Sequence, residues 1–170
     1  PEFIQRMTFV ELGAPSRGHI TPYKNLTAEI DQMVEKINWK FQTGNWKPII
    51  YLKAHHTHEV NNGYYKAADF CMVTSLHDGM NLVAKEFVTN QDENGHGVLI
   101  LSQFAGASRE LRDAVIVNPY DIEEMADSIK TAITMDQLSR KERMQRMKDV
   151  VKENNVYRWA GKLIGELIRV

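Results

Sequence analysis

Five short apolar runs, each separated from the next by a segment of helical character, constrain the fold of this chain more than any other feature. The runs have β-type composition and cover residues 8–12, 48–52, 70–74, 98–101 and 114–117. Strands that alternate with helices form parallel sheets, because the chain must cross back over the sheet before it can add the next parallel strand. The sequence therefore predicts an α/β fold built on a parallel sheet.

Apolar residues at spacings of three and four predict the helices between these strands. The longest predicted helix begins at Thr21-Pro22 and is stopped by Gly44. Its apolar face consists of Tyr23, Leu26, Ile30, Met33, Val34, Ile37 and Phe41. Further helices are predicted over 57–68, 81–91, 121–132, 139–154 and 156–168. With helices on both faces of the sheet, we expect a Rossmann-like domain, in which ligands bind beyond the carboxyl ends of the strands.

Composition narrows the class of protein. Of the 170 residues, 43% are hydrophobic and 25% are charged, which is typical of one globular domain with a sizeable core. The net charge of −1 argues against nucleic-acid binding, which needs a basic excess or a basic face. The single cysteine, Cys71, excludes a disulfide within the chain and fits a reducing compartment. No apolar run reaches the roughly 20 residues of a membrane span, and no signal peptide is visible. We therefore expect a cytoplasmic protein with no membrane partner.

Residues 74–87 contain the most informative motif, because they leave an apolar strand, turn at Asp78-Gly79 and enter a helix. Gly79 allows a ligand to approach the backbone closely, and the N–H groups near Met80, Asn81 and Leu82 favour an anion at the helix N-terminus. Glu86 follows Asp78 by eight residues, about 12 Å if all of them are helical. The spacing fits a nucleotide sugar: Asp78 on the sugar hydroxyls, the helix end on the diphosphate and Glu86 on the ribose.

A purely structural interpretation of the same motif is also open. Asp78 would then be the N-cap of the helix, and Glu86 a solvated helix residue, since caps of this kind are common. The loop at 102–108 has small residues that fit either a close ligand or facing domain, or a tight turn between strand and helix.

The histidines and the cysteine of the sequence do not indicate a second functional site. His55, His56 and His58 lie close in sequence, but only Glu59 accompanies them as a possible further ligand, so we interpret them as loop residues and predict no metal site. His77 flanks Asp78 and fits either the sugar site or a structural role. Cys71, in an apolar strand, is interpreted as a small buried hydrophobe rather than a nucleophile.

Several segments resemble the trehalose-6-phosphate synthase family. The longest covers residues 78–88, DGMNLVAKEFV, and is followed by Gln91-Asp92 and by residues 97–107, GVLILSQFAGA. Further similarity lies at 117–121, and in Ala14-Pro15-Ser16-Arg17 and Tyr23 near the start. The resemblance extends over nearly the whole chain, and the motif around Asp78 is long and specific.

The resemblance implies a retaining glycosyltransferase of the GT-B type, with two Rossmann-like domains that face each other across a cleft. The carboxy-terminal domain mainly holds the donor, UDP-glucose, and the amino-terminal domain mainly holds the acceptor, glucose 6-phosphate. Residues 1–170 are similar to the carboxy-terminal domain alone, as a single nucleotide-sugar-binding domain, and Pro1 in place of Met fits this expectation. We expect these residues on their own to bind nucleotide weakly and to turn over little.

The family's donor-site residues map onto this chain one by one. Asp78 is the implied catalytic residue, which binds the glucose hydroxyls, and Glu86 is implied to hold the ribose. The remaining donor-binding residues are Gly79, Met80, Asn81, Leu82 and Val83 for the sugar and diphosphate, with Tyr51 and Leu52 beside the base. The family needs no metal or other cofactor, and its same-face displacement of the leaving phosphate needs no protein nucleophile.

Two departures from the family keep alternatives open. The basic pair that neutralises the donor diphosphate lies upstream of the region present here, and a helix N-terminus supplies only about half a positive charge. Where the family has an arginine, this chain reads Lys53-Ala54-His55-His56, which leaves the choice between UDP, ADP and GDP open. The alternatives are a glucosylglycerol-phosphate synthase-like enzyme that uses ADP-glucose, a non-catalytic nucleotide- or sugar-binding module, and a related epimerase or phosphorylase. The oligomeric state is also left open.

Overall fold

The computed structural model describes residues 3–14 and 20–169. The chain forms two compact units, Pro1–Thr57 and His58–Val170, and each is described here by itself. Pro1 and the segment Pro15, Ser16 and Arg17, which contributed to the sequence resemblance, lie outside the described residues. The expectation of one domain over 1–170 therefore remains a prediction.

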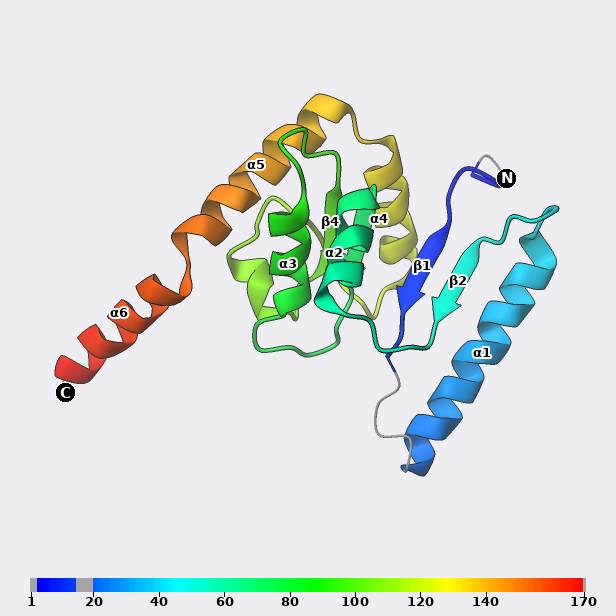
Figure 1. Cartoon of the computed structure of the whole chain (residues 1–170), viewed down its shortest axis with the longest axis horizontal. Helices are drawn as coiled ribbons and strands as arrows, with labels where there is room; N and C mark the ends of the chain where they lie inside the picture. The colour runs from blue at the N-terminus through cyan, green and yellow to red at the C-terminus, as the bar shows by residue number, and fades with distance from the viewer. Residues whose placement is uncertain (1–2, 15–19, 170) are drawn as a thin grey trace. The chain divides into compact units, whose positions relative to one another are not determined.

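The first unit contains a small parallel sheet and one long helix (Figure 1). Strands β1 (Phe9–Leu12) and β2 (Ile49–Leu52) pair in parallel, with Phe9 opposite Ile49. Helix α1 (Thr21–Phe41) has Pro22 in its first turn, as the sequence predicts. The Asn38 side chain accepts the Ile49 N–H at 3.0 Å and donates to the Ile49 carbonyl at 2.9 Å, which ties α1 to the start of β2.

The second unit contains a three-stranded parallel sheet in the order β3-β4-β5. Its elements are α2 (His58–Ala67), β3 (Phe70–Val73), α3 (Leu82–Asn90), β4 (Val98–Ser102), the short 3₁₀ helix η1 (Gly106–Arg109), β5 (Val115–Val117), α4 (Ile122–Thr134), α5 (Gln137–Glu153) and α6 (Val156–Ile168). The five predicted strands are all present and every strand pair is parallel, so the predicted α/β class is confirmed.

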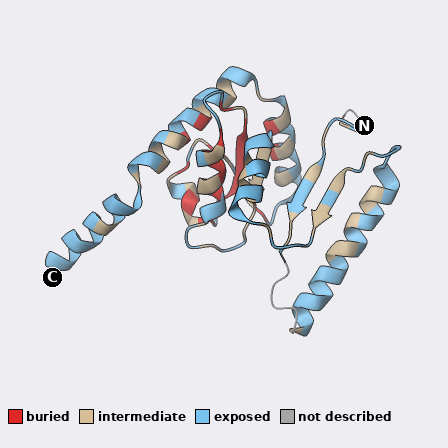
Figure 2. Ribbon diagram, in the orientation of Figure 1, coloured by how far each residue is buried: buried red, intermediate tan, exposed pale blue. Residues whose placement is uncertain are grey.

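Strand β4 lies at the centre of the second unit, and each of its five residues is buried (Figure 2). Because side chains alternate across a strand, Leu99 and Leu101 belong to one core cluster, with Phe87 of α3 among its members. Ile100 belongs to a second cluster with Ala132 of α4. Helices therefore cover both faces of this sheet, the arrangement that its continuous apolar strands predict.

Two element boundaries differ from the sequence expectation for local reasons. The loop after β4 opens into the single-turn η1 rather than into an α-helix. Helix α5 begins at Gln137, two residues earlier than expected, because Asp136 is its N-cap and accepts both the backbone N–H and the hydroxyl of Ser139. Asp121 is the N-cap of α4 and accepts the N–H groups of Glu123 and Glu124 at 3.0 Å each.

Helix α6 carries an exposed apolar face. Its large apolar side chains are from 46% to 84% exposed, and they comprise Val156, Tyr157, Trp159, Leu163, Ile164, Leu167 and Ile168. Across residues 3–14 and 20–169, no helix has both the length and the apolar character needed to cross a bilayer.

The buried centre of β4 makes a first prediction. Replacing Leu99 with Ala removes a fully buried side chain from a cluster that includes Phe87, and the cost should be about 2–5 kcal/mol of unfolding free energy. Urea unfolding followed by circular dichroism measures this loss. Leu138→Ala is the matched control, because Leu138 is 67% exposed and its loss should cost no more than about 0.5 kcal/mol. Equal losses in the two variants would contradict the assignment of the core.

Candidate functional site

The site in the second unit begins where the loops after β3 and β4 join through backbone hydrogen bonds. Asp78 donates its N–H to the Phe104 carbonyl at 3.3 Å, and its own carbonyl accepts the Gly106 N–H at 2.9 Å. The Met80 carbonyl accepts the Ala107 N–H at 2.7 Å. These bonds form an isolated parallel bridge between Asp78 and Ala105, so the two motifs of the sequence resemblance are brought together.

Two glycines at this junction have opposite surroundings. A Cβ on Gly106 would lie 2.0 Å from the Gly79 carbonyl oxygen, so only glycine allows the two backbones to approach this closely. A Cβ on Gly79 would meet no atom within 4 Å. Gly106 is therefore needed for the junction itself, whereas the space beside Gly79 is open.

The Asp78 carboxylate is engaged within its own loop. Its Oδ1 accepts the Met80 N–H and its Oδ2 accepts the side-chain amide of Asn81, both at 3.0 Å. The hydrogen bond from the Met80 backbone, followed by the contribution of Asn81, holds the pKa of Asp78 below its usual value of 3.8. Asp78 is therefore ionised at neutral pH, and each oxygen retains a lone pair for a further donor.

Asn81, rather than Asp78, is the N-cap of α3. Its side-chain oxygen accepts the Ala84 N–H at 3.0 Å, and its backbone has a φ of 72°. Asparagine tolerates positive φ better than most residues, so one side chain meets both local requirements. The interpretation of Asp78 as the helix cap is wrong.

The helix N-terminus offers fewer donors than the sequence indicates. The Met80 N–H is taken by Asp78, and the Ala84 N–H by Asn81. Among the described residues, the N–H groups of Leu82 and Val83 have no acceptor, as expected at the first turn of a helix. An anion at this end of α3 would therefore meet the N–H groups of Leu82 and Val83 rather than that of Met80.

Glu86 lies one helical turn after Leu82 on α3. Helix α3 begins at Leu82, so the helical rise from Leu82 to Glu86 is about 6 Å. The distance of about 12 Å expected between Asp78 and Glu86 assumed that all the residues between them are helical, which they are not. The neighbouring Lys85 forms an ion pair with Glu110 at 2.9 Å. Within the described residues, the one partner of the half-buried Glu86 carboxylate is the Tyr65 hydroxyl, at 3.4 Å from Oε2.

Three aromatic rings lie at the ends of three adjacent strands. His77 follows β3, and its ring centroid is 5.9 Å from that of Phe104, which follows β4. The Phe104 centroid is in turn 5.8 Å from that of Tyr120, beyond β5. Phe104 is 38% exposed and Tyr120 is 61% exposed, so these rings form a partly open aromatic surface next to Asp78. Sequence reasoning singled out His77 but missed its two ring neighbours.

Tyr51 and Leu52 belong to the first unit, at the end of β2. The Leu52 carbonyl accepts the Gly13 N–H at 3.0 Å, and the Tyr51 ring fills the space where a Cβ of Gly13 would lie. Lys53 begins the segment in which the family has an arginine. Its ammonium group forms an ion pair with Asp31, and its Nζ lies 5.3 Å from the centroid of the Tyr51 ring. These residues are described within their own unit only.

The remaining candidates form no metal centre in the described part of the chain. Residues 3–14 and 20–169 contain no group of three or more histidine, cysteine or acidic side chains placed to hold a metal ion. Cys71 is a partly buried member of the core cluster beside β3.

Comparison with known proteins identifies a family and a set of similar structures. The model of glycosyltransferase family 20 matches residues 1–169. The trehalose-6-phosphate synthase of Klebsiella pneumoniae is 36% identical over 167 residues, which are 98% of this chain and 35% of that protein. The Salmonella paratyphi B synthase is 38% identical over 170 residues, which are 100% of this chain and 36% of that protein.

Solved structures agree with the sequence relatives. The E. coli structure bound with UDP-2-fluoro glucose superposes with a TM-score of 0.95 at 36% identity, covering 100% of this chain and 38% of that one. The UDP-forming trehalose-phosphate synthase of Burkholderia xenovorans in complex with glucose-6-phosphate gives a TM-score of 0.92 at 36% identity, covering 96% of this chain and 36% of that one. This chain thus spans about a third of the length of the curated relatives it matches.

The two glycines provide a matched test of the junction. Gly106→Ala should destabilise the chain by about 1–3 kcal/mol, because its Cβ forces the Gly79 carbonyl away. Gly79→Ala should change stability by no more than about 0.5 kcal/mol, because its Cβ enters open space. Urea unfolding of both variants measures the difference. A Gly106→Ala variant as stable as Gly79→Ala would show that the loops do not meet as described.

Proposed function

This chain belongs to glycosyltransferase family 20, and we propose that it is the donor-binding part of a retaining glucosyltransferase. The whole enzyme would transfer glucose from UDP-glucose to glucose 6-phosphate and release trehalose 6-phosphate. The identity of 36% and 38% to two trehalose-6-phosphate synthases, over 98% and 100% of this chain, supports the proposal. The match to about a third of their length fits a carboxy-terminal domain that works with an acceptor-binding domain.

The proposal rests on one observation about six consecutive residues, 78–83. They contain an ionised carboxylate, a glycine with open space beside it and two helix N–H groups that have no acceptor among the described residues. Asp78 is ionised, the space beside Gly79 is open, and Leu82 and Val83 present their N–H groups at the start of α3. A glycosyl diphosphate has hydroxyl donors on its sugar and negative charge on its phosphates. The loop offers a matching acceptor for the first and donors for the second.

Each donor-site residue then has a distinct role. Asp78 accepts hydrogen bonds from the glucose hydroxyls through its remaining lone pairs, and Gly79 lets the sugar lie close to the backbone. The N–H groups of Leu82 and Val83 face the diphosphate. Glu86 accepts from the ribose hydroxyls, and Met80 and Asn81 hold the loop through their contacts with Ala107 and Asp78.

The proposed reaction is a displacement on one face of the glucose ring. The bond between the anomeric carbon and the diphosphate oxygen breaks while the acceptor hydroxyl oxygen attacks the same carbon from the same side. The acceptor proton passes to the departing phosphate oxygen, so glucose is transferred with retention and UDP leaves. Neither a protein nucleophile nor a metal is part of this scheme. The contribution of this chain is to bind and orient the donor.

The family resemblance alone assigns the choice of nucleotide to residues at the end of β2. Tyr51 and Leu52 are the proposed neighbours of the base, and Lys53 is engaged by Asp31. Calorimetry with UDP, UDP-glucose, ADP-glucose and GDP tests both the function and the choice. We expect binding of UDP and UDP-glucose that is weak because a helix N-terminus offsets only about half a charge of the diphosphate. No binding of any of the four at millimolar concentration by a folded sample would contradict the proposal.

The role of Glu86 is tested by Glu86→Gln. The amide keeps the size of the side chain but removes its charge, so UDP affinity should fall by about 1–3 kcal/mol, the range for hydrogen bonds to charged groups. Calorimetry with UDP measures the change. Glu123→Gln, an exposed substitution on α4, is the control and should leave the affinity unaltered. Unchanged affinity in Glu86→Gln would mean that Glu86 is only a solvated helix residue.

The role of Asp78 is tested by comparing two ligands on one variant. Asp78→Ala should weaken UDP-glucose binding more than UDP binding, by about 1–3 kcal/mol. The reason is that only UDP-glucose has the glucose hydroxyls from which the carboxylate would accept hydrogen bonds. Titration of both ligands into the variant and the parent chain gives the difference. Equal losses for the two ligands would show that Asp78 acts only by holding Met80 and Asn81 in the loop.

A further inference from the structure

Tyr65 on α2 is the one described side chain that contacts the Glu86 carboxylate. Its hydroxyl donates to Glu86 Oε2 at 3.4 Å, a long hydrogen bond between two helices that pack side by side. Among the ion pairs of the described residues none involves Glu86, and the neighbouring Lys85 is paired with Glu110. The phenol therefore restrains Glu86 without neutralising its charge.

The backbone and the ring of Tyr65 are fixed by the end of α3. The Tyr65 carbonyl accepts the side-chain amide of Gln91 at 2.6 Å, and the Tyr65 ring meets the ring of Phe87 edge to face, with centroids 6.4 Å apart. Gln91 is itself only 4% exposed, and its amide oxygen accepts the Gly97 N–H at 3.0 Å. A hydrogen-bonded, buried Gln91 thus holds Tyr65 at a set position relative to Glu86.

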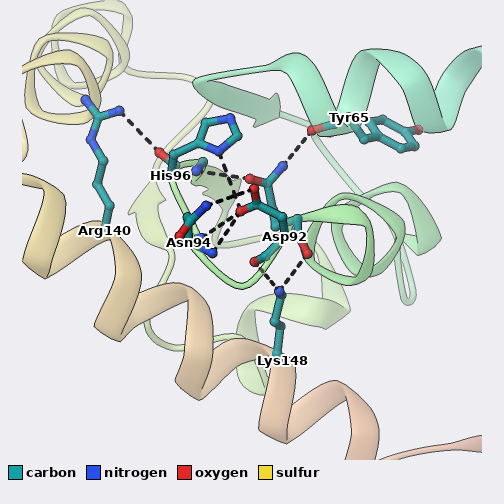
Figure 3. A network of polar contacts seen from close by, with 9 residues as sticks. Tyr65, Asp92, Asn94, His96, Arg140 and Lys148 are labelled. Carbon is teal, nitrogen blue, oxygen red and sulfur yellow. Dashed lines mark hydrogen bonds and ion pairs between the residues drawn. The ribbon is translucent and has the colours of Figure 1, made fainter.

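Helix α5 contacts the segment that follows α3, and Figure 3 shows Arg140 and Lys148 on this helix reaching toward it. The Lys148 ammonium group donates to the carbonyls of Gln91 and Asp92, at 2.6 Å each. Arg140 donates to the His96 carbonyl at 3.2 Å. The segment from Gln91 to Gly97 is therefore held by two cations of α5, which limits the freedom of the residues that anchor Tyr65.

The phenol keeps its proton over the whole neutral range. Burial, together with the negative charge of Glu86, raises the pKa of Tyr65 to about 12. Because a neutral phenol donates its one proton, the Tyr65 hydroxyl remains a donor to Glu86 Oε2 throughout the neutral range. Within the described residues, Glu86 Oε1 has no such partner.

We propose that Tyr65 is a positioning residue, whose hydroxyl fixes Glu86 Oε2 so that Oε1 is presented to the ribose hydroxyls of the donor. This inference rests on the proposed function, because it needs Glu86 to bind ribose. It assigns the recognition of the nucleotide to a pair of side chains from two helices. A free Glu86 side chain would have to lose its rotamer freedom on binding, whereas a restrained one has already lost part of it.

Tyr65→Phe separates this role from packing, because phenylalanine keeps the ring against Phe87 and removes only the hydroxyl. NMR titrations of the ¹⁵N-labelled chain with UDP and with 2′,3′-dideoxy-UDP give affinities for ligands with and without the ribose hydroxyls. Tyr65→Phe should weaken UDP binding about three- to tenfold and leave dideoxy-UDP binding unchanged. Tyr157→Phe, which removes the hydroxyl of an 84% exposed tyrosine on α6, should change neither.

The outcomes distinguish the inference from the function on which it rests. If Tyr65→Phe loses affinity equally for both nucleotides, or for neither, while the parent chain prefers UDP, the positioning role is wrong and the proposed function stands. If the parent chain binds the two nucleotides equally, the ribose role of Glu86 and the inference fall together. If it binds neither, the proposed function fails as well. In the Glu86→Gln background, Tyr65→Phe should have no further effect on UDP affinity, and an undiminished effect there would overturn the inference.

Discussion

The junction of the loops after β3 and β4 depends on the absence of a side chain at Gly106. Because Gly106 has no Cβ, the Gly79 carbonyl oxygen can lie only 2.0 Å from the position of that atom, and the backbone bonds of Asp78 and Met80 to the second loop can form. These bonds continue the β3–β4 pairing beyond the strands as the Asp78–Ala105 bridge. The loop that enters α3 is thereby fixed to the rigid part of the sheet, as a preorganised binding site requires.

In the loop fixed by this junction, Asn81 and Asp78 have different structural roles. Asn81 caps α3 and also donates to Asp78, so the cap and the loop are stabilised by the same residue. Asp78 is then free of the capping role, but its two oxygens still have local partners. Any sugar hydroxyl therefore meets a carboxylate whose direction is already set. The structural role of Asp78 is compatible with its proposed ligand-binding role because each oxygen has a second lone pair.

The sequence predicts the elements of this fold well, because apolar periodicity is a local property. The strands around Leu52, Val73 and Leu101 and the helices between them follow from spacing alone. The motif from Asp78 to Glu86 is also visible in the sequence, as is the glycine-containing loop at Gly106. What local pattern does not contain is contact between separate elements. Tyr65 looks like an ordinary residue of a short amphipathic helix, and its hydrogen bond to Glu86 follows only once α2 packs beside α3. Similarly, the positive φ of Asn81 shortens α3 and makes Asn81 the cap, and no periodicity indicates this.

The charges of the site indicate what this part of the chain contributes to donor binding. Lys85 is the single lysine or arginine within residues 74–87 and 102–107, and it is paired with Glu110. Two carboxylates, Asp78 and Glu86, flank the helix N-terminus, which offsets only about half an elementary charge. A diphosphate placed there is not neutralised by these residues. In the proposed function, the two acids act instead as hydrogen-bond acceptors for hydroxyl groups, and such contacts discriminate between ligands because a missing hydroxyl leaves an acceptor unpaired. For the proposed donor, these residues would select a sugar nucleotide, and the strength of binding would come from positive charge outside these two loops.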